Sequence, residues 1–225
     1  MEKIVLSWST GKDCAMALHE IQNKRMYDVV YLLTTANKNT NRVSRHGVRV
    51  ELLKKQSESI DIPLNLIYLE NSSSNQEYET KMYETLLLIK SKGIRKIAYG
   101  DIGRAELRGK RENKLSAIGF EAIFPLWDMN TNELSKSICQ NGFKSVITCV
   151  DLNTLDKKYV GRIIDEKLLA EFPETVDKCG ENGEYHSFVF DGPIFNRKIK
   201  YDLGEKELMD NRFYYCDLIY TAGET

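Results

Sequence analysis

The feature that most constrains this chain is an alternation of short apolar runs with longer helical patterns over its first two thirds. The apolar runs are rich in β-branched residues, and the stretches between them repeat apolar residues at helical spacing. Near-continuous apolar runs suit a sheet that is covered on both faces. The pattern therefore predicts an α/β fold around a parallel sheet. The expected strands are Lys3–Ser7, Val29–Thr34, Leu64–Leu69, Lys96–Gly100, Ala122–Pro125 and Ser145–Val150.

Amphipathic helices are expected between these strands. After Trp127 the pattern of the sequence changes from this alternation of strands and helices. Beyond that residue we expect helices at Thr131–Asn141 and Lys158–Glu171, because apolar residues recur there at helical spacing. The tail then resembles a series of hairpins, with strands at Glu184–Asp191, Arg197–Asp202 and Phe213–Tyr220. We therefore expect two domains, residues 1–127 and 128–225, with the second docked on the first.

Composition excludes several classes of protein. The chain has 225 residues, with 32 lysines and arginines against 33 acidic residues and a formal net charge of −1. This balance disfavours a DNA-binding protein. The apolar runs are too short for a membrane-spanning helix or a signal peptide, so a cytoplasmic protein with no membrane partner is expected. The five cysteines form no C-x-x-C pair and are expected to be free thiols.

The most informative motif is the segment Ser7–Cys14, where the first expected strand ends and a helix begins. This geometry directs backbone N–H groups and the positive end of the helix at one point, which makes a phosphate site. Gly11 permits close approach of the backbone, and Lys12 adds a mobile cation. The segment is not a Walker A loop, because Leu6 replaces its first glycine and Asp13 follows the lysine.

Two polar connections and one basic run remain open to two interpretations each. The connections 37–46 and 71–76 are long and polar, as in binding loops or lids, although a solvated excursion is the simpler reading. The run from Arg104 to Lys114 alternates basic and acidic residues. It is either a solvated helical face with ion pairs or a cationic rim near the fourth strand.

Several segments resemble a known family. Ser9–Cys14 resembles the S-G-G-K-D-S pyrophosphate loop of the N-type ATP pyrophosphatases, with Thr10 and Cys14 in place of the usual glycine and serine. Over nearly the whole chain, the sequence is similar to the diphthine–ammonia ligase family and its bacterial relatives. The supporting segments are Ser44–Arg49, Tyr99–Ile102, Thr148–Asp151 and Cys179–Phe188.

The resemblance implies a fold of the adenine-nucleotide hydrolase-like (HUP, Rossmann-like) kind. Its parallel sheet has about five strands in the order 3-2-1-4-5, followed by a smaller α+β C-terminal domain. Residues 1–127 would bind ATP, and residues 128–225 would bind the acceptor. Ligands of such sheets bind at the carboxyl ends of the strands, where the strand order reverses. The nucleotide-binding residues that this implies are Ser7, Ser9, Thr10, Gly11, Lys12, Asp13, Cys14, Thr35, His46, Gly100 and Asp101.

The resemblance also implies a reaction. A carboxylate would attack ATP to give an acyl-adenylate and pyrophosphate, and ammonia would then displace AMP to form an amide. Mg²⁺ would accompany the ATP, with Asp13 and Asp101 as candidate ligands. The acceptor would lie on a protein like elongation factor 2 or on a small molecule, and a homodimer is also expected. The implied catalytic residues are Lys12, Asp13, Glu184 and His186, and the implied substrate residues are Glu181, Asn182, Glu184 and His186.

The spacing of Glu184 and His186 carries part of this prediction. Alternation after the Gly180–Gly183 turn would put both side chains on one strand face, where they could orient a substrate or accept a proton from ammonium. Taken alone, such a pair is more often structural. Two other functions remain open: an ATP pyrophosphatase with a different, small-molecule acceptor in a bacterium, and a non-catalytic adenine-nucleotide binding module.

Overall fold

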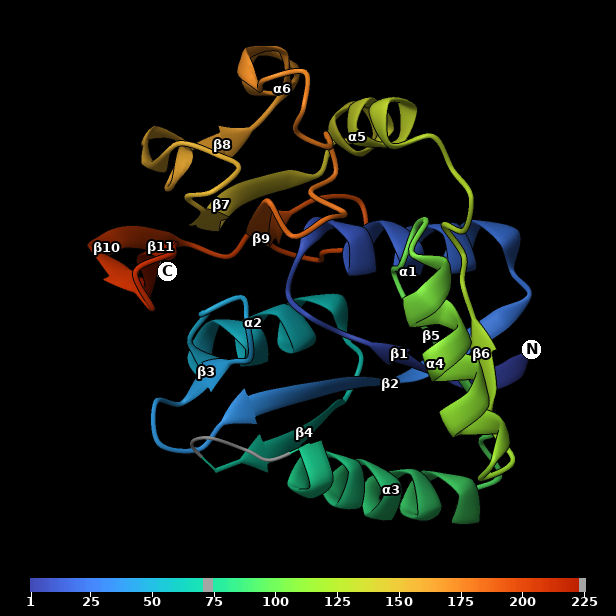
Figure 1. The fold of residues 1–225 in the computed structure, drawn as a ribbon. Helices are drawn as coiled ribbons and strands as arrows, with labels where there is room; N and C mark the ends of the chain where they lie inside the picture. Colours follow the sequence, from blue (N-terminus) through green and yellow to red (C-terminus); the bar gives the residue numbers. More distant parts are fainter. Residues whose placement is uncertain (71–74, 223–225) are drawn as a thin grey trace.

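The computed structural model describes residues 1–70 and 75–222 and contains two sheets (Figure 1). The first sheet is built from β1 (Glu2–Ser7), β2 (Tyr27–Asn37), β4 (Leu64–Leu69), β5 (Lys96–Ala98) and β6 (Glu121–Ile123). Parallel pairing places them in the order β4-β2-β1-β5-β6. The short strand β3 (Arg42–Val43) adds to the end of β2 in the antiparallel sense. The α/β fold and the expected strand order are confirmed.

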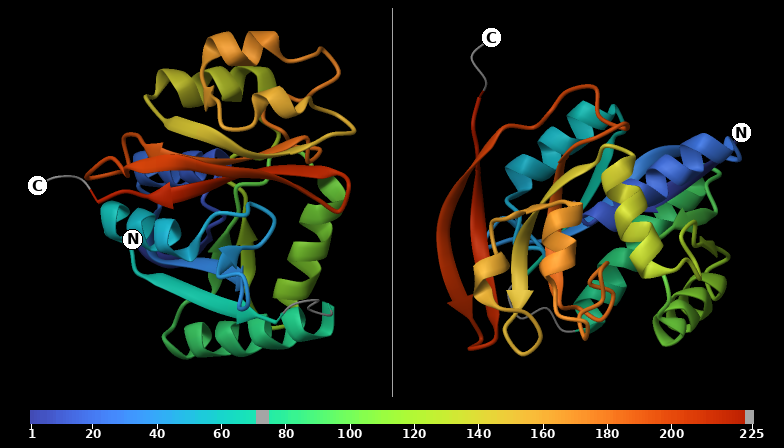
Figure 2. Two further views of the ribbon diagram at one scale, coloured as in Figure 1. Left: turned by 90° about the vertical axis from the view of Figure 1, so that its left-hand side faces the viewer. Right: turned by 90° about the horizontal axis from the view of Figure 1, so that it is seen from above.

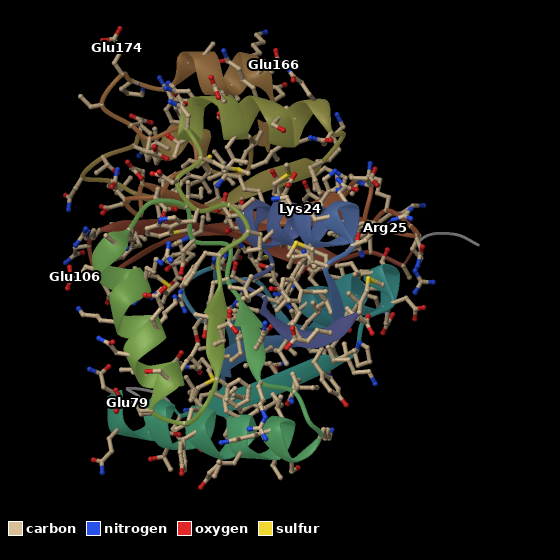
Figure 3. The ribbon with its side chains drawn as sticks, turned by 90° about the vertical axis from the view of Figure 1, so that its right-hand side faces the viewer. Lys24, Arg25, Glu79, Glu106, Glu166 and Glu174 are labelled. Atoms are coloured by element: carbon tan, nitrogen blue, oxygen red, sulfur yellow. The ribbon has the colours of Figure 1, made fainter. Side chains whose placement is uncertain are left out.

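Helices cover both faces of this sheet, as the apolar strands predicted. Side chains of β1 alternate: Ile4 and Leu6 join the core beneath α1 (Lys12–Lys24) and α2 (Val50–Ile60). Val5 joins a second core beneath α3 (Asn75–Ser91) and α4 (Ala105–Ser116). Charged side chains such as Glu79 on α3 and Glu106 on α4 point outward from this side of the molecule (Figure 3).

The second sheet is antiparallel and lies on the outer side of α1 and α2 (Figure 2). Its central strand β7 (Lys144–Asp151) pairs with β8 (Ile163–Ile164), β9 (Tyr185–Asp191) and β11 (Phe213–Tyr220). The edge strand β10 (Tyr201–Met209) pairs with β11, and the helices α5 (Thr131–Gln140) and α6 (Glu166–Glu171) cover the far face.

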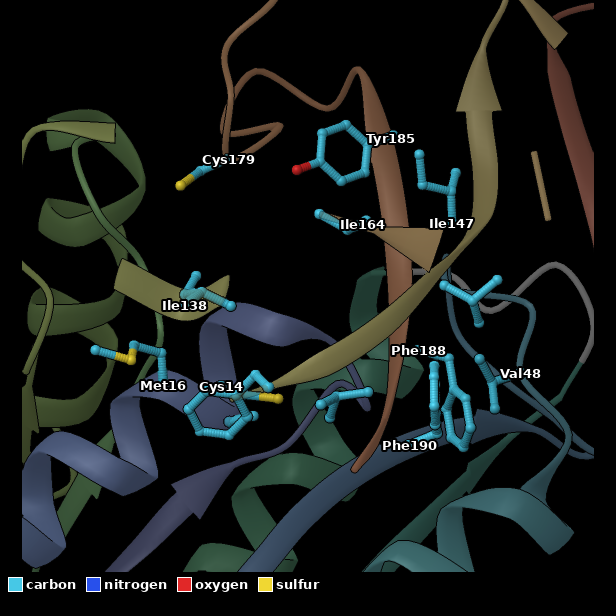
Figure 4. Packing of buried hydrophobic residues seen from close by; sticks show 14 of the residues in the cluster. Cys14, Met16, Val48, Ile138, Ile147, Ile164, Cys179, Tyr185, Phe188 and Phe190 are labelled. Atoms are coloured by element: carbon cyan, nitrogen blue, oxygen red, sulfur yellow. The ribbon is translucent and has the colours of Figure 1, made fainter. Parts of the chain in front are cut away.

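The two sheets share one hydrophobic core, so the expected docking of the tail is confirmed. Figure 4 shows Cys14 of α1 near the start of β7 and Met16 of α1 near Ile138 of α5, with Phe188 and Phe190 of β9 beside Val48. The boundary between the two expected domains stays a prediction.

Ion pairs also hold the second sheet to the first. Asp217 on β11 lies 2.7 Å from the Arg42 Nη1 and 2.5 Å from the Arg49 Nη2 at the start of α2. Although burial acts in the other direction, hydrogen bonds from Arg49 and Arg42 lower the pKa of Asp217 to about 2. The carboxylate is therefore ionised at neutral pH and links both arginines to β11.

Two predictions for the tail are wrong. The helix expected at Lys158–Glu171 is divided into a 3₁₀ turn at Lys157–Tyr159, the strand β8 and the short helix α6. Gly161 has a positive φ of 85°, and the Asp165 carboxylate caps Leu168 N at 2.7 Å, so α6 begins at Glu166.

The second wrong prediction is the series of hairpins. Strand β9 pairs with β7, because its apolar side chains Phe188 and Phe190 pack into the core above α1. The strand expected at Arg197–Asp202 begins only at Tyr201 and continues to Met209, where it forms a hairpin with β11. A pairing partner is chosen by packing between distant segments, which a local pattern does not contain.

The structure also bears on the expectations for the connection 71–76 and for the cysteines. Of the connection 71–76, residues 71–74 lie outside the described residues, and Asn75 and Gln76 begin α3. The cysteines all lie within the described residues and are free, as expected. Across residues 1–70 and 75–222, no helix is both long enough and apolar enough to cross a bilayer.

Candidate functional site

Two adjoining clefts lie at the carboxyl ends of the parallel strands. The larger, of about 1170 Å³, lies between the ends of β1, β2 and β4 and the helices α3 and α4. The smaller, of about 730 Å³, lies between the Ser7–Cys14 loop and the second sheet. The wall common to both consists of Ser7, Ser9, Arg45, His46, Tyr99, Leu107 and Arg111. Open α/β sheets bind ligands at this position, so the clefts are the candidate site.

Two glycines bring the Ser7–Cys14 loop, called the phosphate loop below, into close contact with its surroundings. A Cβ on Gly11 would lie 2.9 Å from Cε1 of His46, and a Cβ on Gly100 would lie 2.8 Å from the carbonyl carbon of Asp13. At Gly11 a side chain would have to displace the His46 ring, whereas at Gly100 it would meet backbone atoms, so only glycine fits there without a shift of the helix start. Gly100 therefore lets the end of β5 pack directly on the first turn of α1, where the helix N–H groups lie.

The helix α1 begins without a side-chain cap from its own N-cap residue, Gly11. Its Lys12 N–H instead donates to Oγ of Ser187 on β9 at 3.3 Å. The second sheet thus reaches the phosphate loop directly. Unpaired N–H groups at a helix start, together with the helix dipole, favour an anion in the adjoining space.

Lys12 is not the mobile cation that the sequence predicted. Its ammonium is buried and donates to Oδ1 of Asp13 at 2.9 Å and to the carbonyl of Cys179. It also lies 4.9 Å from the centre of the Tyr185 ring, whose hydroxyl points toward the Cys179 segment in Figure 4. Although burial acts against the charge, the Asp13 carboxylate raises the pKa of Lys12 above its usual value.

The two candidate metal ligands both have cationic partners. Asp13 accepts from Lys12, and Oδ2 of Asp101 lies 2.7 Å from Nε of Arg111. Within residues 1–70 and 75–222, no cluster of three or more His, Cys, Asp or Glu side chains could hold a metal ion. Any Mg²⁺ here would therefore rely on oxygen atoms of a ligand for most of its coordination.

His46 and His186 lie side by side in the smaller cleft. Their ring centres are 4.6 Å apart with the planes inclined by 34°, and Nδ1 of His46 is 3.1 Å from the Ser187 carbonyl. Burial and the positive charges of Lys12 and Arg45 lower the pKa of His46 to about 4. Burial, His46 and the same two cations lower the pKa of His186 well below its usual value. Both rings are neutral at pH 7.

Glu184 and His186 do not point into the same space. Glu184 precedes β9, and its carboxylate accepts from Asp177 N at 3.1 Å and from Asn182 N at 3.0 Å. It therefore closes the turn before β9 and lies outside the lining of both clefts. Glu181 lies in the smaller cleft, where its Oε1 accepts from the N–H groups of Ile102 and Gly103, each at 3.2 Å.

The structure brings most of the predicted site residues together. Thr35 lines the larger cleft, while Ser7, Ser9 and His46 line both. Thr10 and Gly11 line neither, since Thr10 is fully buried and His46 covers Gly11. The predicted residues in the smaller cleft are Lys12, Asp13, Cys14, Gly100, Asp101, Glu181, Asn182 and His186.

Sequence reasoning missed several residues of the clefts. Tyr99 and Arg111 line both, and the Arg111 guanidinium lies 4.0 Å from the centre of the Tyr99 ring. Arg111 belongs to the basic run of α4, which proves to serve both roles considered for it. Arg108 pairs with Glu112 one turn away, whereas Arg104, Arg111 and Lys114 line the clefts. Asp151 ends the segment Thr148–Asp151 that supports the family resemblance, whereas Arg212 and Tyr215 from the second sheet had no distinguishing sequence signal of their own.

Comparison with known proteins covers both sheets. The family model described as "Diphthamide synthase N-terminal domain" matches residues 1–120, and the one described as "Diphthamide synthase C-terminal domain" matches residues 130–219. Proteins named diphthine–ammonia ligase are 32% identical over 130 residues in mouse and in human, covering 55% of this chain and 49% of each relative. In zebrafish the identity is 26% over 164 residues, covering 66% of this chain and 64% of the relative.

The chain thus spans about half the length of the mammalian relatives that it matches. The two family models together cover the phosphate loop, both clefts and most of the second sheet. The chain belongs to the diphthamide synthase family of PP-loop proteins.

Proposed function

We propose that this chain is an ATP-dependent amide ligase that adenylylates a carboxylate and then amidates it with ammonia, as a diphthine–ammonia ligase would. The observation that carries the proposal is the meeting of three parts in one place. The start of α1, the end of β5 and the start of β9 all lie at the smaller cleft. A phosphate site in contact with a second domain is the arrangement that a two-substrate ligase requires.

Residues of the larger cleft and of the start of α1 have the chemistry to bind the base and the phosphates of a nucleotide. The larger cleft offers Thr35 and the apolar side chains of Leu33 and Leu69 to a base, while the start of α1 offers N–H groups to phosphate. The phosphates would lie beside Lys12, Asp13 and Cys14 at the start of α1, which line the smaller cleft. We therefore assign the base to the larger cleft and the phosphates to the boundary with the smaller one.

A magnesium ion fits this site only as part of the nucleotide complex. Asp13 and Asp101 both face the smaller cleft, yet each already has a cation at hydrogen-bonding distance. Mg²⁺ commonly uses one or two carboxylates together with phosphate oxygens. When bound, the ion would offset negative charge on the pyrophosphate, and the roles of Asp13 and Asp101 would be to hold it and to position Lys12 and Arg111.

The acceptor carboxylate is assigned to the wall from the second sheet. Asp151 and Arg212 form a hydrogen-bonded pair there, with Nη2 of Arg212 2.5 Å from Oδ2 of Asp151. Tyr215 completes this wall and packs on Gly47. We propose a diphthine-bearing protein such as elongation factor 2 as the acceptor, because the named relatives are diphthine–ammonia ligases.

Product analysis tests this function. With diphthine-bearing elongation factor 2, ATP, Mg²⁺ and ammonium, we expect AMP and pyrophosphate by chromatography. Lys12→Gln should lower AMP formation at least tenfold, because it removes a buried cation at the phosphate loop. The matched control is Lys24→Gln, on the same helix but exposed (Figure 3), which should leave the rate unchanged.

Three outcomes would contradict the proposal. ADP as the main product would exclude cleavage between the α and β phosphates. ATP binding without cleavage would favour a binding module. AMP formation that depends on a small carboxylic acid, but not on the protein acceptor, would favour the pyrophosphatase with a small-molecule acceptor.

A further inference from the structure

The two histidines of the smaller cleft have ring nitrogens without a partner. Nδ1 of His46 lies 3.1 Å from the Ser187 carbonyl, and a carbonyl can only accept. Nδ1 therefore carries the proton of the neutral ring, and Nε2 carries a lone pair. Within residues 1–70 and 75–222, no group hydrogen-bonds to Nε2 of His46 or to either ring nitrogen of His186.

The two histidine rings lie close to the phosphate loop. The His46 ring covers Gly11, since a Cβ there would touch its Cε1 at 2.9 Å. The next residue along β9 after His186 is Ser187, whose hydroxyl accepts from Lys12 N at the start of α1. The pair therefore lies beside the phosphate loop, on the side that faces the second sheet.

We propose that His46 and His186 together form the binding site for the ammonia molecule that attacks the activated carboxylate. This inference rests on the proposed function, since it assigns that reaction's second substrate to a place. Ammonia has three N–H donors and one lone pair, so it needs acceptors that leave its lone pair free. An imidazole lone pair on Nε2 of His46 and the acceptor nitrogen of His186 meet this need.

The charges around the pair select ammonia over ammonium. The groups that act on both rings are Lys12 from α1 and Arg45 from the turn before α2, and both are positive. The same cations and partial burial that keep the rings neutral also disfavour a bound cation. Four carboxylates of the smaller cleft do not oppose this, because each already has a partner. Asp13 pairs with Lys12, Asp101 with Arg111 and Asp151 with Arg212, and Glu181 accepts from two backbone N–H groups.

The step balances without further reactants. The ammonia lone pair forms the C–N bond, the bond between the acyl carbon and the phosphate oxygen breaks, and its electron pair leaves with AMP. The extra proton on nitrogen passes to the departing phosphate or to water. With a pKa of about 4, His46 is too weak a base to hold that proton, so the pair orients ammonia and does not store its proton.

The experiment separates adenylylation from amide formation. Exchange of labelled pyrophosphate into ATP, with the protein acceptor and no ammonium, reports adenylylation alone. His46→Asn keeps an amide that can donate to the Ser187 carbonyl but removes the Nε2 lone pair. We expect His46→Asn and His186→Asn to keep exchange within about threefold while KM for ammonium rises at least tenfold. His19→Asn, on α1 but outside the lining of both clefts, is the matched control and should change neither.

A further measurement needs no change in the site. Because the fraction present as NH₃ rises tenfold per pH unit below the pKa of ammonium, KM for total ammonium in the wild type should fall about tenfold per unit from pH 7 to 8.

Each other outcome overturns the proposal. Unchanged KM for ammonium in both variants would place ammonia elsewhere, and a KM independent of pH would mean that ammonium itself binds. Loss of exchange in a folded variant would place the histidines in the nucleotide site. A wild-type chain without exchange would instead contradict the proposed function, and the inference with it.

Discussion

Thr10 shows how a single residue is strained at this site. Its φ is 75°, in the left-handed region that β-branched residues rarely adopt, and its side chain is fully buried. Its Oγ1 has no hydrogen-bond partner among the described residues. The backbone carbonyl of the same residue accepts from Gln56 Nε2 at 3.0 Å and from Val189 N at 2.9 Å. These bonds hold the strained conformation in place, where related loops have glycine.

Thr10→Gly should therefore stabilise the protein. Relief of the left-handed strain and loss of the unpaired buried hydroxyl together exceed the extra chain entropy of glycine, by an amount on the order of 1 kcal/mol. The measurement is urea unfolding followed by circular dichroism. Thr10→Ala removes only the hydroxyl and the β-branch, so it separates the two causes. Equal unfolding free energies of Thr10→Gly and the wild type would show that the left-handed conformation of Thr10 does not lower the stability.

At the scale of elements, the site depends on how closely β5 approaches α1. Gly100 follows β5, and a side chain there would meet backbone atoms of Asp13 and Cys14 at 2.8 and 2.9 Å. Backbone atoms at the start of a helix have little freedom to move. Because Gly100 has no side chain, the end of β5 can pack directly on the start of α1 and position it.

Gly100→Ala tests this contact. The added Cβ must push β5 away from α1, which should cost about 1–3 kcal/mol of unfolding free energy and weaken ATP binding. Gly103→Ala is the matched control, because nothing lies within 4 Å of its Cβ position. It should change the stability by less than about 0.5 kcal/mol. Calorimetric ATP titration and denaturant unfolding of both variants decide the question, and equal behaviour would refute the close-packing argument.

At the scale of the whole molecule, Asp217 links the two sheets through Arg42 and Arg49. Its pKa of about 2 lies below that of an ordinary aspartate, since the two arginines favour the charged form. A lowered pKa contributes stability that is complete above about pH 4 and is lost as the pH falls toward 2. The partial exposure of Arg49 reduces the contribution, because water screens that pair.

Asp217→Asn should lower the unfolding free energy by about 1–2 kcal/mol at pH 7. Unfolding measured from pH 7 to pH 2 should then show a weaker loss of stability between pH 4 and 2 than in the wild type. Asp202→Asn, on the exposed strand β10, is the control and should match the wild type throughout. A variant that keeps the wild-type pH dependence would show that the acid loss arises elsewhere.

The sequence by itself determined the strands of the parallel sheet and the place of the phosphate loop. Alternation of apolar runs with helical patterns depends on neighbours two to four residues apart, so it predicted every strand of the parallel sheet except the two-residue β3. The small residues of Ser7–Cys14 also act locally, because they permit the turn between β1 and α1. The expected strand order came from the family resemblance, and the pairings confirm it.

Only the tertiary structure decided which side chains meet across the clefts. His46 and His186 are 140 residues apart, and their contact depends on the pairing of β9 with β7 above α1. The same packing buries the Lys12 ammonium against the Cys179 carbonyl and turns Glu184 away from the cleft. Such contacts depend on core packing between distant segments, and local periodicity holds no information about the partner that a segment will choose.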